Sequence, residues 1–373
     1  MTDKYRFSRR DFLKFSASAL GSAFFSTLNL PSVAAADPPA PLLGRVCWNK
    51  VTVHESPDYS GAVLKTFKFD TILEIEQSVR SPDTSAYNRV WYQLREGGYV
   101  YSGGVQPVKE VLNEPVAEIP KEVGLLAELT VPFSDSHWKP TKNSRRGYRL
   151  YYGTTYWVRA LFEDEKGNPW YRIYDDLMKL VFFVRAEHLR IVPPGELTPL
   201  SPNVPEQEKR IVVSLPEQKM AAFEGERAVF VAKISSGRGK GNMHYASTPS
   251  GRFTTFFKRP AGHMVGGSGG SAYDLPGVPW ASYINDQGVS FHGTYWHNDF
   301  GAPRSAGCIN LPNEQAKWIY RWTTPSVPEQ KRHIYQPGTG TRVLIYEEPV
   351  FSPNSSPIRF RLDDDPRFDS KER

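Results

Sequence analysis

Residues 289–311 read VSFHGTYWHNDFGAPRSAGCINL, and this stretch decides the fold of the C-terminal part of the chain. It places His292 at the end of an apolar run typical of a strand, and Cys308 after a glycine. The spacing of sixteen positions from His292 to Cys308 allows a loop to return the thiol to the imidazole. Gly293 and Gly307 leave room for close backbone approach. Because an imidazole beside a thiol makes cysteine nucleophilic, the pair is a candidate for nucleophilic catalysis.

Short apolar runs on both sides of this stretch predict a β-rich domain. Residues 210–214, 228–232 and 341–346 have the composition of strands. Residues 312–320 predict a short helix, with Asn313 as its N-cap. The 31 Pro and 29 Gly among 373 residues indicate many turns and few long helices. We therefore expect a mainly β fold, with two small barrels followed by a β-rich catalytic domain and a short helix after the nucleophile.

The motif resembles that of the L,D-transpeptidase (YkuD-like) family. The family pattern is His-Gly, a variable loop, and Ser-His-Gly-Cys followed by an apolar residue and Asn or Arg. It is matched here by His292-Gly293 and residues 305–310. The run TPSGRF at 248–253 and the Pro-Trp pair at 279–280 extend the resemblance over residues 209–347.

One position departs from the family pattern. Ala306 stands where the family usually has a second histidine, so the imidazole that would line the site beside the sulfur is missing. His297 lies in the intervening loop, five residues after His292. We take His297 as the candidate to fill that place.

The resemblance implies a cysteine acyltransferase without a cofactor or metal, acting on peptidoglycan stem peptides. Cys308 would attack the carbonyl on the L-centre of the third stem residue, releasing the terminal D-alanine and leaving a thioester. His292, oriented by the Gly293 backbone, would transfer the protons, and the backbone at Gly307 and Cys308 would hold the oxyanion. Carbapenems, which acylate the same sulfur in the family, are expected inhibitors. The expected substrate-binding residues are Ser305, Asn310, Arg304, His297 and Trp280.

Several other interpretations stay open. Cys308 could form a disulfide with Cys47, the only other cysteine, or join His292, His297 and Asp299 around zinc, although its motif lacks a typical zinc spacing. The same thiol could transfer the acyl group to water, which would make the protein an L,D-carboxypeptidase. A non-catalytic wall-binding protein is the third alternative. The acceptor in the transfer reaction could be a stem peptide or a protein amine.

The N-terminus predicts an export signal. Residues 8–14 read SRRDFLK and precede a mildly apolar run that ends in the small residues 33–36. The paired arginines resemble a twin-arginine signal, which implies the twin-arginine machinery as a partner and a soluble protein in the periplasm or cell wall. An uncleaved membrane anchor is the alternative. This segment carries five basic and two acidic residues, about half of the net charge of +6, so charge gives no argument for nucleic acid.

A weak internal repeat lies between the signal and residue 200. Trp91-Tyr92 recurs as Trp170-Tyr171, and Thr52-Val53 recurs at 130–131, with spacings of 79 and 78 positions. The order of short strands in each copy resembles bacterial SH3-like modules. In the second copy, three aromatic side chains either bind glycan or peptide or pack at an edge: Tyr148, Tyr151 and Tyr152.

Composition also marks the connections. The Pro-rich residues 193–208 predict a stiff, exposed linker. The glycine-rich residues 263–271 predict either a lid over the substrate or an ordinary loop, and residues 237–241 predict a turn because they lack the full phosphate-loop spacing. The expected domains are a signal peptide at 1–36, SH3-like modules at 43–110 and 122–192, the linker at 193–208, the catalytic domain at 209–348 and a loose tail at 349–373.

Overall fold

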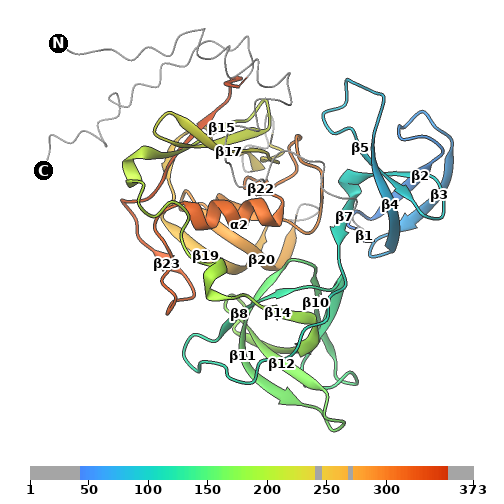
Figure 1. Cartoon of the computed structure of the whole chain (residues 1–373), viewed down its shortest axis with the longest axis vertical. Coiled ribbons are helices and arrows are strands. Elements are labelled where there is room, and N and C mark those ends of the chain that lie inside the picture. The colour runs from blue at the N-terminus through green and yellow to red at the C-terminus, as the bar shows by residue number, and fades with distance from the viewer. Residues whose placement is uncertain (1–42, 240–245, 268–271, 352–373) are drawn as a thin grey trace, which may run out of the picture.

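The computed structural model describes residues 43–239, 246–267 and 272–351. The expected signal peptide, most of the tail and part of the glycine-rich segment lie outside these residues. The fold is mainly β, with two N-terminal antiparallel sheets and a β-rich region that has one short α-helix after Cys308, which confirms the predicted fold class. Figure 1 shows three parts of the chain, which we call bodies: the first (residues 43–108) is blue, the second (125–191) is green and the third (209–346) runs from yellow to red. In the part of the chain that is described, no helix is long and apolar enough to cross a membrane.

The first body is a strongly curved sheet in which nearly every strand is short. Its order is β3-β2-β6-β5-β4-β1-β7, and its core includes Val46, Val53 and Leu94. A 3-10 turn at Ser102–Gly104 leads from β6 into β7. The strands are β1 (Leu43–Val46), β2 (Lys50–His54), β3 (Val63–Lys68), β4 (Ile72–Arg80), β5 (Val90–Leu94), β6 (Tyr99–Tyr101) and β7 (Val105–Val108).

The second body repeats this topology. Its order, β10-β9-β13-β12-β11-β8-β14, matches that of the first sheet strand for strand. A 3-10 turn at Ala186–His188 again precedes the last strand. The strands are β8 (Leu125–Leu129), β9 (Phe133–His137), β10 (Arg146–Tyr151), β11 (Thr155–Glu163), β12 (Pro169–Asp175), β13 (Leu180–Arg185) and β14 (Leu189–Ile191).

The repeat is visible in one pair of side chains. His54 in β2 meets Trp91 edge-on at 5.6 Å between ring centroids, and His137 in β9 meets Trp170 in the same way at 5.6 Å. The tryptophans are the residues that the sequence pairing matched. The Thr-Val pairing was wrong, because Thr52-Val53 lies within β2 whereas residues 130–131 lie before β9. Histidine and tryptophan, not Thr-Val, mark the common register.

The third body contains two five-stranded sheets, with orders β17-β16-β15-β24-β18 and β22-β21-β20-β19-β23. Helix α2 (Asn313–Trp322) packs on β20 and β21, and Figure 1 shows it between the sheets. The strands are β15 (Lys209–Ser214), β16 (Lys219–Glu224), β17 (Arg227–Lys233), β18 (Gly251–Thr254), β19 (Phe257–Gly266), β20 (Tyr273–Tyr283), β21 (Ser290–Gly293), β22 (Ile309–Leu311), β23 (Ile334–Tyr335) and β24 (Arg342–Tyr346).

The helix start differs from the expectation. Asn313 is not the N-cap, because Pro312 occupies that position and makes no side-chain cap bond. The Asn313 side chain instead donates to the Gly153 carbonyl in the second body at 3.1 Å. The buried face of α2 includes Ala316, Ile319 and Tyr320. A contact between bodies has therefore replaced the local cap.

Most residues of the Pro-rich connection are exposed and none is buried, and the connection is also anchored to the rest of the chain at several points. It contains 3-10 turns at Pro194–Glu196 and Glu206–Glu208. Glu196 accepts from Arg190 at 2.7 Å and also contacts Lys317 of α2. Arg321 of α2 donates to the Thr198 carbonyl at 2.8 Å. These contacts fasten the connection to the helix.

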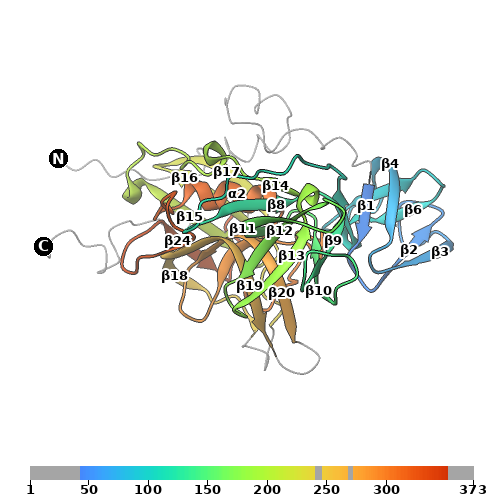
Figure 2. The same cartoon turned by 90° about the horizontal axis from the view of Figure 1, so that it is seen from below.

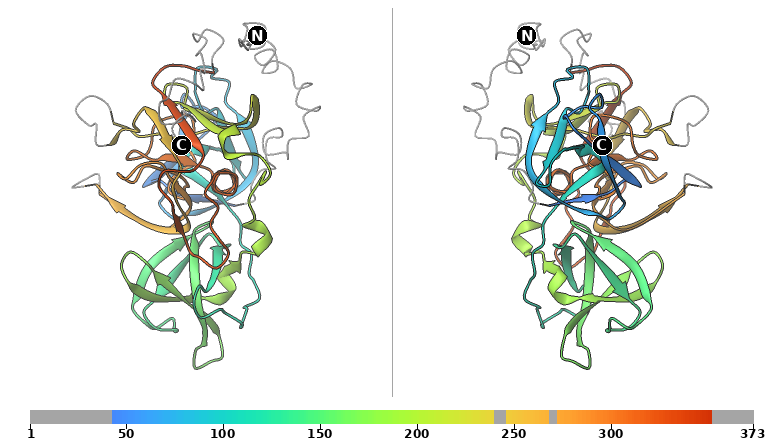
Figure 3. Two further views of the ribbon diagram at one scale, coloured as in Figure 1. Left: turned by 90° about the vertical axis from the view of Figure 1, so that its left-hand side faces the viewer. Right: turned by 90° about the vertical axis from the view of Figure 1, so that its right-hand side faces the viewer.

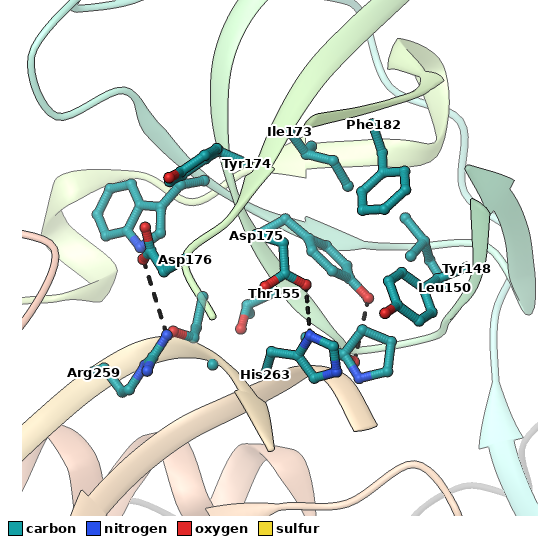
Figure 4. A pocket seen from close by; sticks show the side chains of 16 residues that line it. Tyr148, Leu150, Thr155, Ile173, Tyr174, Asp175, Asp176, Phe182, Arg259 and His263 are labelled. Atoms are coloured by element: carbon teal, nitrogen blue, oxygen red, sulfur yellow. Dashed lines mark hydrogen bonds and ion pairs between the residues drawn. The ribbon is translucent and has the colours of Figure 1, made fainter. Parts of the chain in front are cut away.

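The second body also lies against β19 and β20, below the other two bodies in Figure 3 and over the sheets of the third body in Figure 2. His263 in β19 contacts Asp175 of the second body at 2.6 Å (Figure 4), and on its other side it contacts Asp274 at 2.5 Å. Burial opposes protonation, but the hydrogen bonds to the two carboxylates raise the pKa of His263. The cavity beside it, about 30 Å³, has room for about one water and has no lining residue from 289–311. It is therefore no candidate for a peptide site.

Candidate active site

Strands β21 and β22 place four polar side chains on one face. The two strands are parallel, and His292 stands opposite Asn310 in the register. Because side chains alternate along a strand, Ser290 shares the face of His292, and Cys308 shares that of Asn310. The Ser290 Oγ lies 3.7 Å from the Cys308 Sγ, and the Asn310 Nδ2 lies 3.1 Å from the His292 Nε2. The structure thus brings together the two ends of the sequence motif.

The two cysteines have opposite environments. Both are free; Cys47 is buried, and Cys308 is partly exposed. Burial raises the pKa of Cys47 to about 12. Burial also opposes ionisation of Cys308, but a hydrogen bond and the charge of His292, with help from Ser290, lower its pKa below the usual value. Cys308 is therefore the reactive thiol of the described residues.

His292 is held on both sides of its ring. Its Nδ1 lies 2.9 Å from the Gly293 carbonyl oxygen, which can only accept, so Nδ1 carries a proton and donates. The remaining nitrogen, Nε2, is then the one that exchanges a proton with the thiol. A Cβ on Gly293 would lie 2.4 Å from the Asn313 Oδ1 and 2.8 Å from Pro279, so only glycine fits beside the histidine.

Ser305 and Gly307 shape the turn before the nucleophile. Ser305 Oγ accepts from the Gly307 N–H at 3.0 Å and donates to the Cys308 carbonyl at 2.5 Å. Gly307 has φ of 128°, which disfavours any other residue, and its carbonyl accepts from Thr248 at 2.7 Å. The Gly307 N–H is already used by Ser305, which does not fit the expected oxyanion role for that group. We assign Gly307 a conformational role.

His297 lies behind Asn310, not beside the sulfur. Its Nδ1 accepts from the Asp299 N–H at 3.2 Å, and its Nε2 donates to the Asn310 Oδ1 at 3.2 Å. The side chain is 4% exposed. With both ring nitrogens engaged and no access to solvent, His297 does not line the site in the place of the missing histidine. Ala306, in contrast, is exposed next to Cys308.

Two other expected substrate residues also lie elsewhere. Trp280 is 1% exposed and packs against Tyr320 at 5.5 Å in the core, with φ of 61°. Arg304 is paired with Asp299, and its guanidinium donates to the Tyr87 hydroxyl at 2.9 Å. Burial in one case and an existing ion pair in the other disfavour contact with a substrate carboxylate.

Some residues of the site were missed. Ser290 lies two positions before His292, and strand alternation alone would have placed it on the catalytic face. Thr248 belongs to the quoted TPSGRF run but was given no role. Asp299, Tyr87 and Tyr101 meet only through the packing of separate bodies, for which the sequence gives no signal. In the described ranges, no group of three or more His, Cys, Asp or Glu side chains could hold a metal ion.

Burial of His297 predicts a pH-dependent loss of stability. Burial is the main cause that lowers its pKa to about 4, against about 6.5 in an unfolded chain. Below pH 6.5 the unfolded chain therefore binds a proton that the folded protein refuses until about pH 4. The stability contribution falls as the pH falls through this window, by up to about 3 kcal/mol.

The measurement is urea unfolding of wild type and His297→Gln between pH 4 and pH 7. Gln cannot titrate but keeps a donor for Asn310. We expect the advantage of wild type over the variant to shrink by about 3 kcal/mol from pH 7 to pH 4. If the free energy of unfolding changes with pH in the same way for both proteins, burial of a neutral His297 is not the cause of the pH dependence.

Comparisons with known proteins agree with the location of this site. Residues 208–345 match the family model of YkuD, the L,D-transpeptidase catalytic domain. No curated protein sequence matches the chain.

Three solved structures are similar. A mutant of the Enterococcus faecium L,D-transpeptidase has 24% identity and a TM-score of 0.29, and the match covers 37% of this chain and 50%, or about half, of that protein. L,D-transpeptidase 3 from Mycobacterium tuberculosis, in complex with a faropenem-derived adduct, has 18% identity and a TM-score of 0.30 over 47% of this chain and 77% of its own. The catalytic domain of the E. faecium enzyme acylated by ertapenem has 26% identity and a TM-score of 0.28, with coverages of 37% and 97%. It is over residues 208–345, the part that holds His292 and Cys308, that this protein carries the similarity to the L,D-transpeptidase catalytic domain.

Proposed function

We propose that the protein is a peptidoglycan L,D-transpeptidase with Cys308 as the nucleophile and His292 as the base. The observation that carries this proposal is the geometry of the site, in which the parallel strands β21 and β22 bring His292 and Ser290 to one face with the partly exposed Cys308, whose Sγ lies 3.7 Å from the Ser290 Oγ. His292 and Ser290 lower the pKa of Cys308 against the effect of burial. A thiol of that kind, partly exposed at the end of a loop, is suited to attack a carbonyl. The match of residues 208–345 to the catalytic domain supports the same reaction class.

The reaction would proceed in two acyl transfers. The Cys308 sulfur attacks the carbonyl of the third stem residue, and His292 gives the thiol proton to the departing D-alanine amine as the amide bond breaks. The acyl group then rests on the sulfur as a thioester. An incoming amine gives its proton to His292 and takes the acyl group, which restores the thiol. Ala306, two positions before Cys308 in the chain, is exposed and adds no group that could take part in these proton transfers.

The N-terminal parts of the proposal follow from the sequence. A twin-arginine signal in residues 1–36 would export the protein to the periplasm or cell wall. The sheets at 43–108 and 125–191 would be SH3-like modules that accompany the catalytic domain, and their shared strand order supports a common module. The domain boundaries given above belong to the same proposal.

The test is the intact mass of the mature protein after incubation with a tetrapeptide-stem muropeptide and, separately, with a carbapenem. We expect an adduct on wild type and none on Cys308→Ala, with free D-alanine and a cross-linked dimer from the muropeptide. An adduct with D-alanine but no dimer would identify the L,D-carboxypeptidase instead. A folded wild type that forms no adduct with either compound would reject both and leave a wall-binding protein.

A further inference from the structure

Side chains of the first N-terminal body hydrogen-bond to the loop between His292 and Cys308. Asp299, near the middle of this loop, is 0% exposed. The hydroxyl of Tyr101 in β6 donates to its Oδ1 at 2.7 Å, and that of Tyr87, just before β5, donates to its Oδ2 at 2.8 Å. A carboxylate removed from water needs such partners, because each unmade hydrogen bond would cost free energy. Two partners of Asp299 thus come from a body that lies outside the match to the catalytic domain.

The backbone of the first body also packs closely against this loop, at Gly103. The Asn298 N–H donates to the Gly103 carbonyl at 2.9 Å. A Cβ on Gly103 would lie 2.5 Å from Tyr101 and 2.8 Å from the Asp299 carboxylate, so any larger residue would push the loop away. The Asp299 charge is balanced by Arg304, whose Nε donates at 2.8 Å. The first body therefore completes the surroundings of the buried Asp299 carboxylate, whose partner Arg304 has a side chain that is 38% exposed.

A chain of hydrogen bonds leads from Asp299 to the base. A backbone N–H can only donate, so the contact from Asp299 fixes the His297 tautomer, with its Nε2 protonated. That proton goes to the Asn310 Oδ1, which turns the amide so that Nδ2 faces His292. The Nδ2 group in turn orients the His292 ring, whose tautomer, with the proton on Nδ1 and the lone pair on Nε2, is fixed by the Gly293 carbonyl. A base for the Cys308 thiol requires this tautomer.

We propose that Tyr87 and Tyr101 of the first body are positioning residues of the active site, which hold Asp299 and, through His297 and Asn310, set the orientation of His292. The inference rests on the proposed role of His292 as the base. It makes the first body a working part of the enzyme rather than a separate binding module. Neither tyrosine touches the substrate or the reacting atoms in this account.

The test is the double variant Tyr87→Phe with Tyr101→Phe, which removes two hydroxyls and no ring. Two readouts are measured: the pH profile of Cys308 alkylation by iodoacetamide, and kcat and KM for D-alanine release from a tetrapeptide stem. We expect kcat to fall roughly tenfold with little change in KM, because the loss acts on the base and not on substrate binding. The alkylation profile should move to higher pH. Cys47, buried in the first body, should stay unmodified in the folded protein.

A matched control is Tyr171→Phe. The Tyr171 hydroxyl is a hydrogen-bond partner of the Val116 N–H at 2.6 Å, in the second body, so this variant loses a comparable bond away from the loop. It should leave both readouts as in wild type. If the double variant does not fold, the single variant Tyr87→Phe, at a side chain that is 43% exposed, tests the same contact.

A double-mutant cycle separates positioning from general destabilisation. If the tyrosines act through His297, adding Tyr101→Phe to His297→Leu should lower kcat by less than about twofold, although each change alone lowers it several-fold. If the two substitutions lower kcat independently, so that their fold-changes multiply in the double variant, the proposal that the tyrosines act through His297 is overturned.

The outcomes also separate this inference from the proposed function. One outcome is that the tyrosine variants shift the pH profile of Cys308 alkylation while the wild-type protein releases no D-alanine. This outcome would support the positioning role and count against the transpeptidase. Normal D-alanine release and an unshifted profile in the double variant would overturn the positioning role and leave the transpeptidase standing.

Discussion

Replacing His292 by alanine is expected to lower turnover about a thousandfold, the largest effect on activity that we predict for a residue other than the nucleophile. The variant loses the group that accepts and returns the proton. It also loses the hydrogen bond and charge that lower the pKa of Cys308, while the opposing effect of burial remains. The pKa of Cys308 should therefore rise.

The measurement is the iodoacetamide reaction of Cys308 across pH, followed by intact mass beside D-alanine release. Iodoacetamide reacts with the thiolate of Cys308, and this thiolate should form at lower pH in wild type than in His292→Ala. Alkylation at pH 7 should therefore be roughly a hundredfold slower in the variant. His333→Ala is the control, because His333 contacts the Phe257 ring and not the thiol. Equal alkylation profiles in wild type and His292→Ala would show that His292 does not activate the sulfur.

The elements and the nucleophile pair could be predicted from local sequence because both depend on short-range patterns. The apolar runs gave β15, β17 and β24 to within one residue at each end. The pairing of His292 with Cys308 followed from one strand, one loop and the next strand, and the parallel register of β21 and β22 is the structural counterpart. No contact between distant bodies was needed for either step.

The surroundings of the pair could not be predicted, because they come from long-range packing. Tyr101 and Asp299 are separated by 198 positions in the chain. The local sequence of the loop does not predict that Asp299 is buried. The roles of His297 and Arg304 were assigned to substrate for the same reason: a polar loop residue is by default exposed. Trp280 was misplaced because a residue near a catalytic motif can equally belong to the core under it.

The same packing bears on Ala306. The family histidine at this position would add an imidazole on the open side of the sulfur, whereas this chain has an exposed methyl there. His297 does not restore that imidazole, since it is buried on the opposite side of Asn310. It contributes an orienting contact instead. The departure at Ala306 leaves the contacts that His292 makes with Gly293 and Asn310 in place.

Replacing Arg45 by methionine is expected to lower the free energy of unfolding by about 3–5 kcal/mol, the largest stability effect that we predict. The Arg45 side chain is 1% exposed and pairs with Asp70 at 2.8 Å. It also donates to Gln106 at 2.8 Å and to the Tyr295 carbonyl in the catalytic loop, and its guanidinium lies over the Tyr151 ring of the second body at 4.2 Å. Methionine fills much of the volume but removes this donor from the buried Gln106 side chain and the Tyr295 carbonyl, and from Asp70, which is 12% exposed and keeps Arg149 at 3.0 Å.

The control is Arg95→Met, which breaks another arginine–carboxylate pair in the same sheet. Arg95 meets Glu74 at 3.0 Å, but both side chains are more than half exposed, at 63% and 61%. Solvent screens such a pair, so its loss should cost less than about 1 kcal/mol. Urea unfolding followed by tryptophan fluorescence measures both variants. Equal losses in the two would mean that water reaches Arg45 in solution, and that the three bodies are not joined through this residue. A large loss at Arg45 alone, with slower Cys308 alkylation, would tie the junction of the bodies to the catalytic loop through the Tyr295 carbonyl.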